Sequence, residues 1–457
     1  MTGRHDARYY LPRFTRLEDR VAARATGKLR DYSRQSAGGA TPKAEEKEKY
    51  YSDDPETGIP FIRVQNLSVS GALSLDDVKL INRETHNGML ARSHVGPDDL
   101  LTKITGVGRM AVSSVPPPGF EGNINQHLVR IKTKDRHTSE VLAAYLNTDI
   151  AEQLATRRAT GGTRPALDYP ALRSIPIIFD ERILPIASAA RDRRNKRLEE
   201  AAALLASIDG YLLSELGIAL PPETENTLAN RTFRVSAHEL GGWRFDPHAL
   251  HPDVEACREA IERLPNSAHL RQVVSFSRDQ VAGRQEPLPY VGLEHVQGGT
   301  GILLDVEYEE DFGSALMFEP GHVLFPKLRP YLNKVHLADT TGYCSTEFHV
   351  LQAKAVSPEF LTLVLRSEIT VRQTKHLMTG NTLPRLQTRD IERLPIPIPD
   401  KDIQDRIVTY AAKTQSEAVK LTQSAITELE SAKREIEAIL LESPEQVHQP
   451  QNSFALG

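Results

Sequence analysis

Two short stretches of the sequence combine positive charge, small hydroxyl side chains and glycine. Lys and Arg side chains neutralise phosphates, while hydroxyl groups and the free N–H groups of a glycine-containing loop donate hydrogen bonds to them. The sequence therefore predicts two loops that could bind phosphate groups, with a helix end closed by a glycine as the alternative. The residues are Arg157, Arg158, Thr160, Gly162, Thr163 and Arg164 in the first stretch, and Lys375, Thr379, Asn381, Thr382 and Arg385 in the second.

Polar side chains that could read base edges lie in the same two halves of the chain. Arg, Asn and Gln side chains, together with smaller hydroxyl groups, distinguish base pairs in the major groove. Each residue could equally be a polar group of a turn or a strand edge. The candidates are Lys103, Thr105, Arg109, Asn123, Asn125, Gln126 and His127 in the first half, and Lys327, Arg329, Tyr331, Asn333, Lys334, Ser345 and Thr346, followed by Glu347, in the second.

Motifs for catalysis are missing from the sequence. Residues 27–29 (Gly-Lys-Leu) lack the other residues of a phosphate-binding loop, and there is no adenine-methyltransferase Asn/Asp-Pro-Pro-Tyr/Phe motif. The acidic pair at 98–99 with Lys103 could belong to a nuclease, but residues 321–322 (Gly-His) take the place of that pair in the second half. A turn before a strand explains the pair better, so we expect no catalytic residue and no cofactor held by this chain.

The best candidate for a metal site is the group Asp246, His248, His251 and Asp253. Its two histidines could share one face of a helix, but two prolines interrupt that helix and the first half has no corresponding histidine. The two cysteines of the chain are too few for a four-cysteine zinc site. We therefore expect no metal site.

These residues belong to two similar copies of one sequence pattern, and the second copy follows the first at an offset of about 220–235 residues. The ends of the two copies agree best: 13 residues separate Thr163 from Pro176, and 13 separate Thr382 from Pro395. Short β-branched runs predict strands in each copy, followed by a helical stretch. The expected strands are 60–64, 100–104, 110–115 and 127–131, then 290–293, 322–325, 335–338 and 348–352, and the helical stretches are 139–158 and 358–377.

A long helical pattern follows each copy. Apolar and small residues recur at spacings of three and four, through positions such as Ile183, Ala190 and Ala201 and later through Ile407, Glu435 and Ile439. Such length is typical of a coiled coil or spacer, although each helix could simply pack on its own domain. We predict domains at 1–180 and 243–399, helices at 181–217 and 400–443, a linker at 218–242 and a disordered tail at 444–457.

The combined motifs resemble the specificity subunit of type I restriction-modification systems. They are the segment 58–67 (Gly-Ile-Pro-Phe-Ile-Arg-Val-Gln-Asn-Leu), the turns at 97–101 and 320–324, the Thr-Gly-x-Thr elements and the Ile-Pro-Ile exits before the helices. The resemblance implies an α+β fold with two similar target-recognition domains, two long antiparallel helices and a pseudo-two-fold internal repeat. It further implies that each domain reads one half of a split DNA sequence in phage defence.

The same resemblance implies partners. Two methyltransferase subunits and then restriction-translocase subunits would dock on the helices, and S-adenosylmethionine, ATP and Mg²⁺ would bind to those partners. A protein scaffold that does not bind DNA is the alternative function.

Composition excludes some classes of protein. The 457 residues include 56 Lys and Arg against 61 Asp and Glu, so the chain is not globally basic, although a local basic face is compatible with this balance. No apolar stretch approaches the ~18 residues of a membrane span. We expect a cytoplasmic protein.

Overall fold

The computed structural model describes residues 7–225, 227, 229–230, 232–236, 244, 247–304, 312–380 and 383–442. The chain divides into two compact units, residues 1–198 with 422–457 and residues 199–421. The predicted tail at 444–457, much of the predicted linker, Asp246, Asn381 and Thr382 lie outside the described residues. No helix among the described residues is long and apolar enough to cross a membrane.

The first unit is built on a four-stranded antiparallel sheet in the order β2-β10-β7-β8. Helix α5 packs on β7 and β8, and its Leu142 and Tyr145 join Leu100, Val129 and Ile131 of the sheet in one buried core. The elements are α1 (Pro12–Ala22), α2 (Leu29–Tyr32), β2 (Gln35–Gly38), β7 (Leu100–Lys103), β8 (Ser113–Ser114), β10 (Leu128–Lys132), α5 (Arg136–Leu146), α6 (Asp149–Arg158) and α7 (Tyr169–Arg173).

A second sheet of the first unit has the order β3-β5-β4-β9-β6, in which β4 and β9 are parallel. Ile62 of β4 and Ile124 of β9 are fully buried and pack with Leu101 and Leu128 of the first sheet. The two sheets therefore share a small core. The strands are β3 (Tyr51–Ser52), β4 (Ile59–Ile62), β5 (Lys79–Ile81), β6 (His94–Val95) and β9 (Gly122–Ile124), and short helices α3 (Lys47–Tyr50) and α4 (Arg83–Asn87) flank them.

The second unit repeats this plan. Its main antiparallel sheet has the order β13-β20-β17-β18, and its second sheet, β14-β16-β19-β15, again contains one parallel pair, β15 with β19. The predicted α+β class with two similar domains is therefore confirmed. The elements are α9 (Pro252–Glu262), α10 (Leu270–Val273), β13 (Val274–Ser277), β14 (Gln280–Val281), β15 (Tyr290–Val291), β16 (Ala315–Phe318), β17 (His322–Pro326), β18 (His336–Leu337), β19 (Gly342–Ser345), β20 (Phe348–Ala353), α11 (Pro358–Arg366), α12 (Glu368–Leu377) and α13 (Thr388–Glu392).

Each expected helical stretch is divided into two helices. In the first unit, the Thr148 hydroxyl accepts a hydrogen bond from the Ala151 N–H (3.2 Å) and so caps the start of α6. In the second unit, Ser367 ends α11 and precedes α12 in an extended conformation. Small hydroxyl residues favour such helix starts, which explains why one continuous helix does not form.

A two-stranded ribbon closes each unit before its long helix. β1 (Gly27–Lys28) pairs with β11 (Pro176–Ile177), and β12 (Ser267–His269) pairs with β21 (Pro395–Pro397). The prolines of the two Ile-Pro exits thus lie in strands, where their missing N–H groups are tolerated at an edge.

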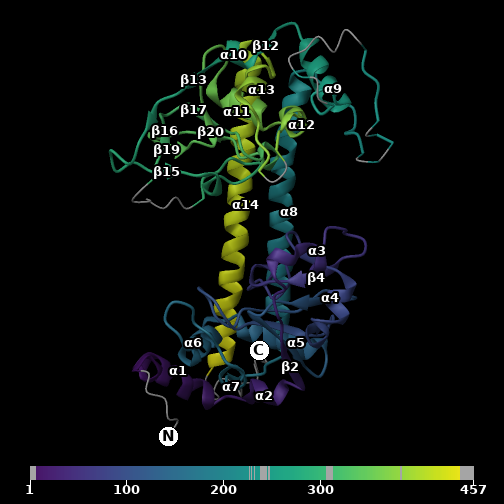
Figure 1. Ribbon diagram of the computed structural model, residues 1–457. Helices are drawn as coiled ribbons and strands as arrows, with labels where there is room; N and C mark the ends of the chain where they lie inside the picture. Colours follow the sequence, from purple (N-terminus) through teal and green to yellow (C-terminus); the bar gives the residue numbers. More distant parts are fainter. Residues whose placement is uncertain are drawn as a thin grey trace, which may run out of the picture. The chain divides into compact units, whose positions relative to one another are not determined.

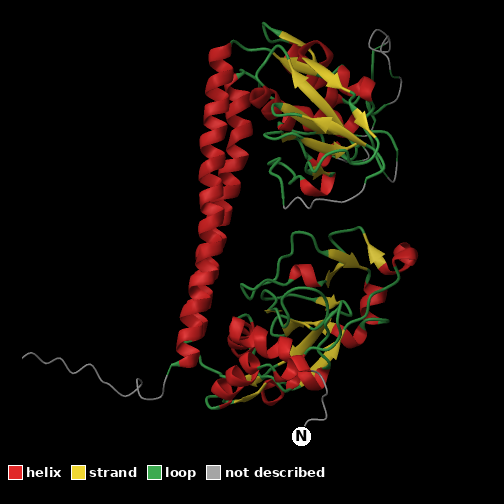
Figure 2. Cartoon of the chain, turned by 90° about the vertical axis from the view of Figure 1, so that its left-hand side faces the viewer, coloured by secondary structure: helices red, strands yellow, loops and turns green. Residues whose placement is uncertain are grey.

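The long helices are α8 (Ile183–Glu215) and α14 (Lys401–Leu441). They run antiparallel in each unit, as the sequence colours of Figure 1 show, and Figure 2 shows them side by side. In the first unit, Glu428 of α14 pairs with Arg193 (2.5 Å) and Arg197 of α8. In the second, Tyr211 stacks on Tyr410 with ring centroids 3.9 Å apart.

Small residues form much of the buried face of these helices, among them Ala190, Ala201, Ala418, Ala425 and Ala432. Small side chains allow two helix axes to approach closely, which supports the predicted coiled-coil pairing inside each unit. The expected position Glu435 is wrong for the end of the second seam, whereas Ile439 is partly buried against the core. Glu435 is exposed, whereas Ile436 and Leu440 are buried, because the spacing there is four residues throughout.

Candidate nucleic-acid interface

Three loops of the first unit meet at one end of its main sheet. The Ile104 N–H donates to the His127 carbonyl (3.0 Å), the Leu167 N–H donates to the Ile104 carbonyl (2.8 Å), and the Gly106 N–H donates to the Pro165 carbonyl (3.1 Å). These bonds join the loop after β7 (104–112), the turn before β10 (125–127) and residues 160–166. We call this set the three-loop end of the first unit.

The second unit has the same arrangement. The Lys327 N–H donates to the Glu347 carbonyl (2.7 Å), the Leu386 N–H donates to the Lys327 carbonyl (2.8 Å), and the Arg329 N–H donates to the Pro384 carbonyl (2.9 Å). The three-loop end of this unit consists of residues 327–334, 345–347, 379–380 and 383–385. The matching bonds make Ile104 equivalent to Lys327 and His127 equivalent to Glu347.

The Thr-Gly stretches are loops, not glycine caps of a helix. The residue after α6, Ala159, is extended (φ −65°, ψ 146°), and the residue after α12, Met378, is equally extended. Gly161 and Gly380 adopt left-handed conformations (φ 96° and 97°) inside the loops. A Cβ on Gly161 would lie 2.9 Å from the Arg164 carbonyl, so the tight turn favours glycine there.

Main-chain pairing closes both loops. Thr160 and Ala166 exchange two backbone hydrogen bonds of 2.8 Å each, and Thr379 and Arg385 exchange bonds of 2.9 and 2.8 Å. In the first unit, this closure leaves Gly162, Thr163 and Arg164 exposed along with Thr160. Within the described residues, no side chain pairs with the Arg164 guanidinium. The first loop therefore presents the groups that phosphate binding requires.

The prediction is wrong for Arg157 and Arg158, because both side chains are buried, with 9% and 6% exposure. Both pair with Glu18 of α1, and Arg158 also donates to the Ser174 hydroxyl (3.0 Å). The Arg157 guanidinium lies 4.2 Å from the centre of the Tyr9 ring. These arginines fasten α1 to α6. Glu18 was missed because nothing in its local sequence points to a partner so distant in the chain.

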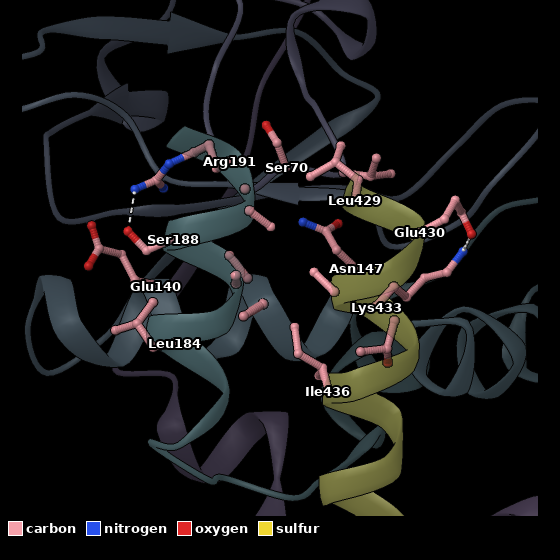
Figure 3. Close-up of a pocket in the computed structure, with 18 of the residues that line it drawn as sticks. Ser70, Glu140, Asn147, Leu184, Ser188, Arg191, Leu429, Glu430, Lys433 and Ile436 are labelled. Atoms are coloured by element: carbon pink, nitrogen blue, oxygen red, sulfur yellow. Dashed lines mark hydrogen bonds and ion pairs between the residues drawn. The ribbon is translucent and has the colours of Figure 1, made fainter. Parts of the chain in front are cut away.

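Arg109 lies in the 104–112 loop, but its side chain contacts the junction of α5 and α6. Its guanidinium pairs with Asp149 (2.6 Å) and donates to the Asn147 carbonyl (2.6 Å) and the Thr148 carbonyl (2.5 Å). Arg109 lines a pocket of about 80 Å³ formed by α5, α8 and α14, whose other residues are shown in Figure 3. It stabilises the junction of α5 and α6, and its assignment to base reading is wrong.

Two other residues of the first unit have structural roles. Asn123 is fully buried, where it bonds to His86 Nδ1 (2.5 Å) and the Leu90 carbonyl (2.9 Å), so it cannot contact a base. The buried Asn125 accepts a hydrogen bond from the His127 N–H (3.1 Å) and thereby shapes the turn. Gln126 at the turn tip is exposed, and His127 is half-buried.

Lys103 and Thr105 lie where the first unit's loop leaves β7. Lys103 is buried, and its ammonium donates to the Val107 carbonyl (2.6 Å) while burial lowers its pKa. Its base-reading assignment is therefore wrong, since it braces the loop from inside. Thr105 is half-buried and forms a β-bridge with Ala166.

Glu347 lies between two cations in the second unit. Arg385 pairs with it at 2.8 Å and lowers its pKa, and Lys327 lies close by with its ammonium on the Thr346 carbonyl (2.7 Å). Burial lowers the pKa of Lys327. The half-buried Ser345 hydroxyl accepts from the Glu347 N–H (3.2 Å), and Thr346 is exposed. The structure thus brings these predicted residues together.

The loop after β17 is held in an unusual conformation. Arg329 and Asn333 have left-handed backbones (φ 48° and 51°) on either side of Tyr331, which is 42% exposed. Asn333 donates to the Arg366 carbonyl (2.7 Å), and Lys334 donates to the Leu293 carbonyl (2.7 Å). Tyr331 is therefore presented at the loop tip, while Asn333 and Lys334 support it.

Lys375 pairs with Glu223 of the segment that precedes α9, so its charge is already partnered. Its neighbour His376 lies near two further polar residues, His251 and Asp253. Lys375 is not part of the three-loop end.

Residues 321–431 match the family model described as the type I restriction modification DNA specificity domain. The match begins at β17 and extends into α14, and it confirms the resemblance indicated by the sequence motifs. The matched residues include the described part of the second unit's three-loop end.

One curated relative, the specificity subunit of the Escherichia coli type I restriction enzyme EcoDI, is 28% identical over 91 residues. This alignment covers 20% of this chain and 20% of the relative, so the chain matches about a fifth of that protein's length.

Two solved structures resemble the chain more extensively at lower identity. A chain from a study of the assembly and conformational transition of the type I R-M system is 16% identical, with a TM-score of 0.44, and the match covers 91% of this chain and 97% of that one. The HsdS subunit from Thermoanaerobacter tengcongensis is 15% identical, with a TM-score of 0.32 and coverage of 90% and 94%.

Proposed function

We propose that this chain is the DNA sequence-recognition subunit of a type I restriction-modification complex and that each unit reads one part of a bipartite target. The observation that carries the proposal is the three-loop end, which occurs in both units with the same backbone hydrogen bonds. Each end joins a loop after a sheet strand to a Thr-Gly loop.

The side chains on this shared frame differ between the units. Gln126 and His127 of the first turn correspond to Thr346 and Glu347 of the second, and Gly106 corresponds to Arg329. Base reading depends on the donors and acceptors that a side chain presents, so two different sets on one frame suit two different half-sites. Backbone-binding groups, by contrast, need only charge and N–H donors.

The helices would serve as docking surfaces for two methyltransferase subunits. Val419 in the second unit's part of α14 and Ile426 in the first unit's part are each 54% exposed. Exposed apolar side chains on a helix favour contact with a partner protein. In this proposal, restriction subunits join afterwards, and the partners hold S-adenosylmethionine, ATP and Mg²⁺, while this chain performs no catalysis.

Selection from a random duplex library tests the proposal. The full chain is mixed with its methyltransferase subunits, and retained duplexes are sequenced. We expect a split motif with two fixed blocks, and the same motif should lose N6-methyladenine in a host from which the gene is deleted. Retention without any sequence preference would favour the protein scaffold and overturn the proposed function.

A further inference from the structure

We propose that the second unit contains a binding site for a divalent transition-metal ion of the zinc type, formed by His251, Asp253 and His376. The potential ligand atoms of these three side chains all lie within 4.8 Å of one another. His251 directly precedes α9, Asp253 is the second residue of that helix, and His376 lies in the last turn of α12. Helices α9 and α12 pack against each other (Figure 1).

The distances fit a metal better than hydrogen bonds. Asp253 Oδ2 lies 3.5 Å from His251 Nδ1 and 3.6 Å from His376 Nε2. An ordinary hydrogen bond would be ~2.7–3.2 Å long. Zinc bonds of ~2.0–2.2 Å in a tetrahedron separate neighbouring ligand atoms by about 3.4 Å. Both distances are therefore close to the edge of a zinc tetrahedron.

The nitrogen of His376 lacks a satisfactory partner without a metal. Among the described residues, its buried Nε2 has no hydrogen-bond partner, although buried polar atoms are normally paired. The His376 and His251 rings are stacked at 3.8 Å with an angle of 12° between their planes, so metal binding requires one ring to turn until both in-plane lone pairs point to the ion. The Asp253 N–H donates to His251 Nδ1 at 3.2 Å, a long contact that coordination of this nitrogen would replace.

The carboxylate of Asp253 is already oriented for this role. Thr224 donates its hydroxyl (2.8 Å) and its N–H (3.1 Å) to Oδ1, and the same N–H makes only a longer contact (3.4 Å) with Oδ2, the oxygen near the two histidines. Such outer contacts orient the ligands in metal sites. Two imidazoles and one carboxylate, with water in the fourth position, form a donor set typical of zinc.

The first unit shows that the fold does not require these residues. Pro12 and Pro252 each begin the equivalent helix, so Leu11 and Arg13 take the places of His251 and Asp253. Arg157 takes the place of His376 and pairs with Glu18. One unit thus joins its two helices by an ion pair, and the other would join them through a metal.

The test uses the full chain without an affinity tag, purified from cells grown with Zn²⁺ and measured for bound metal by mass spectrometry. We expect one zinc ion per chain and competition with a chromophoric chelator. Asp253→Asn and His376→Gln should each weaken zinc binding more than about 100-fold, and Thr224→Ala should weaken it about 10-fold. Thr224→Ser should restore binding because it keeps the hydroxyl.

His269→Gln is the matched control, because His269 lies in the same unit with its Nδ1 on the Arg393 carbonyl (2.9 Å). Circular dichroism at room temperature checks that each variant is folded. Addition of zinc should raise the melting temperature of the metal-free wild type and of His269→Gln, but not that of Asp253→Asn. Absence of zinc binding by the folded wild type, or unchanged binding in both ligand variants, would overturn the proposal.

Discussion

Glu18 provides the sharpest test of how the first unit is held together. It is 24% exposed and neutralises Arg157 and Arg158, whose side chains are 9% and 6% exposed. Replacement by Ala leaves two buried guanidinium groups without this carboxylate. Removal of one partner from a buried ion pair costs about 3–5 kcal/mol, because the remaining charge has lost its water without compensation.

This energy corresponds to a large thermal shift. In a unit of this size, 1 kcal/mol lowers the melting temperature by ~2–4 °C, so Glu18→Ala should lower it by ~6–20 °C. Calorimetry and far-UV circular dichroism of the full chain measure the shift. Asp53→Ala is the control, because Asp53 and its partner Lys47 are 84% and 63% exposed and such a pair contributes only ~0–1 kcal/mol.

Two results would refute this reasoning. A melting temperature of Glu18→Ala equal to that of the control would show that the buried pair contributes little. Alternatively, Arg158→Ala could keep its melting temperature yet lose affinity for all duplexes, which would return Arg158 to phosphate binding.

Three further outcomes are expected. In filter-binding assays, Arg164→Ala should reduce the slope of log affinity against log salt concentration by about 0.9 without changing half-site preference. Arg173→Ala is the control and should leave the slope unchanged, because Arg173 is exposed on α7, outside the loop. Equal slopes for both variants would exclude a phosphate contact at Arg164. Burial, assisted by nearby Lys327, lowers the pKa of His349 to about 3, so between pH 6.5 and 3 the unfolded chain binds one proton more than the folded chain. The free energy of unfolding, measured in urea, should therefore fall by about 2 kcal/mol from pH 7 to 5. His349→Phe should flatten this pH dependence, and an unchanged slope would show that His349 is not its cause. Ile426→Glu should abolish co-purification of the methyltransferase subunit while the chain remains folded, and normal co-purification would exclude this face of α14 as the docking surface.

The repeat could be predicted from the sequence because its ends keep the same spacing and its strands follow local β-branched patterns. The Thr-Gly loops could be predicted because their conformation depends on local residues. Gly161 and Gly380 adopt the left-handed backbone conformation that favours glycine, and Thr163 and Arg164 lie exposed in the turn after Gly161.

The fate of single polar residues could not be predicted, because it depends on contacts between distant parts of the chain. Arg157 and Arg164 have similar local sequence surroundings. Arg157 is nevertheless buried beside Glu18, whereas Arg164 is exposed. The same holds for the site proposed above. His251 and Asp253 are two residues apart, but His376 is more than 120 residues away, so local helical spacing could not place it beside them.

The bonds that assemble each three-loop end run between backbone atoms, and a peptide group is the same whatever residue carries it. Residues at tip positions such as Gln126 or Thr346 can therefore be substituted without loss of the backbone hydrogen bonds that hold the loops together. If the tips read bases as proposed, point mutations there would be enough to change the preferred DNA sequence. For the same reason, saturation libraries confined to these tips should yield many folded variants with altered preferences.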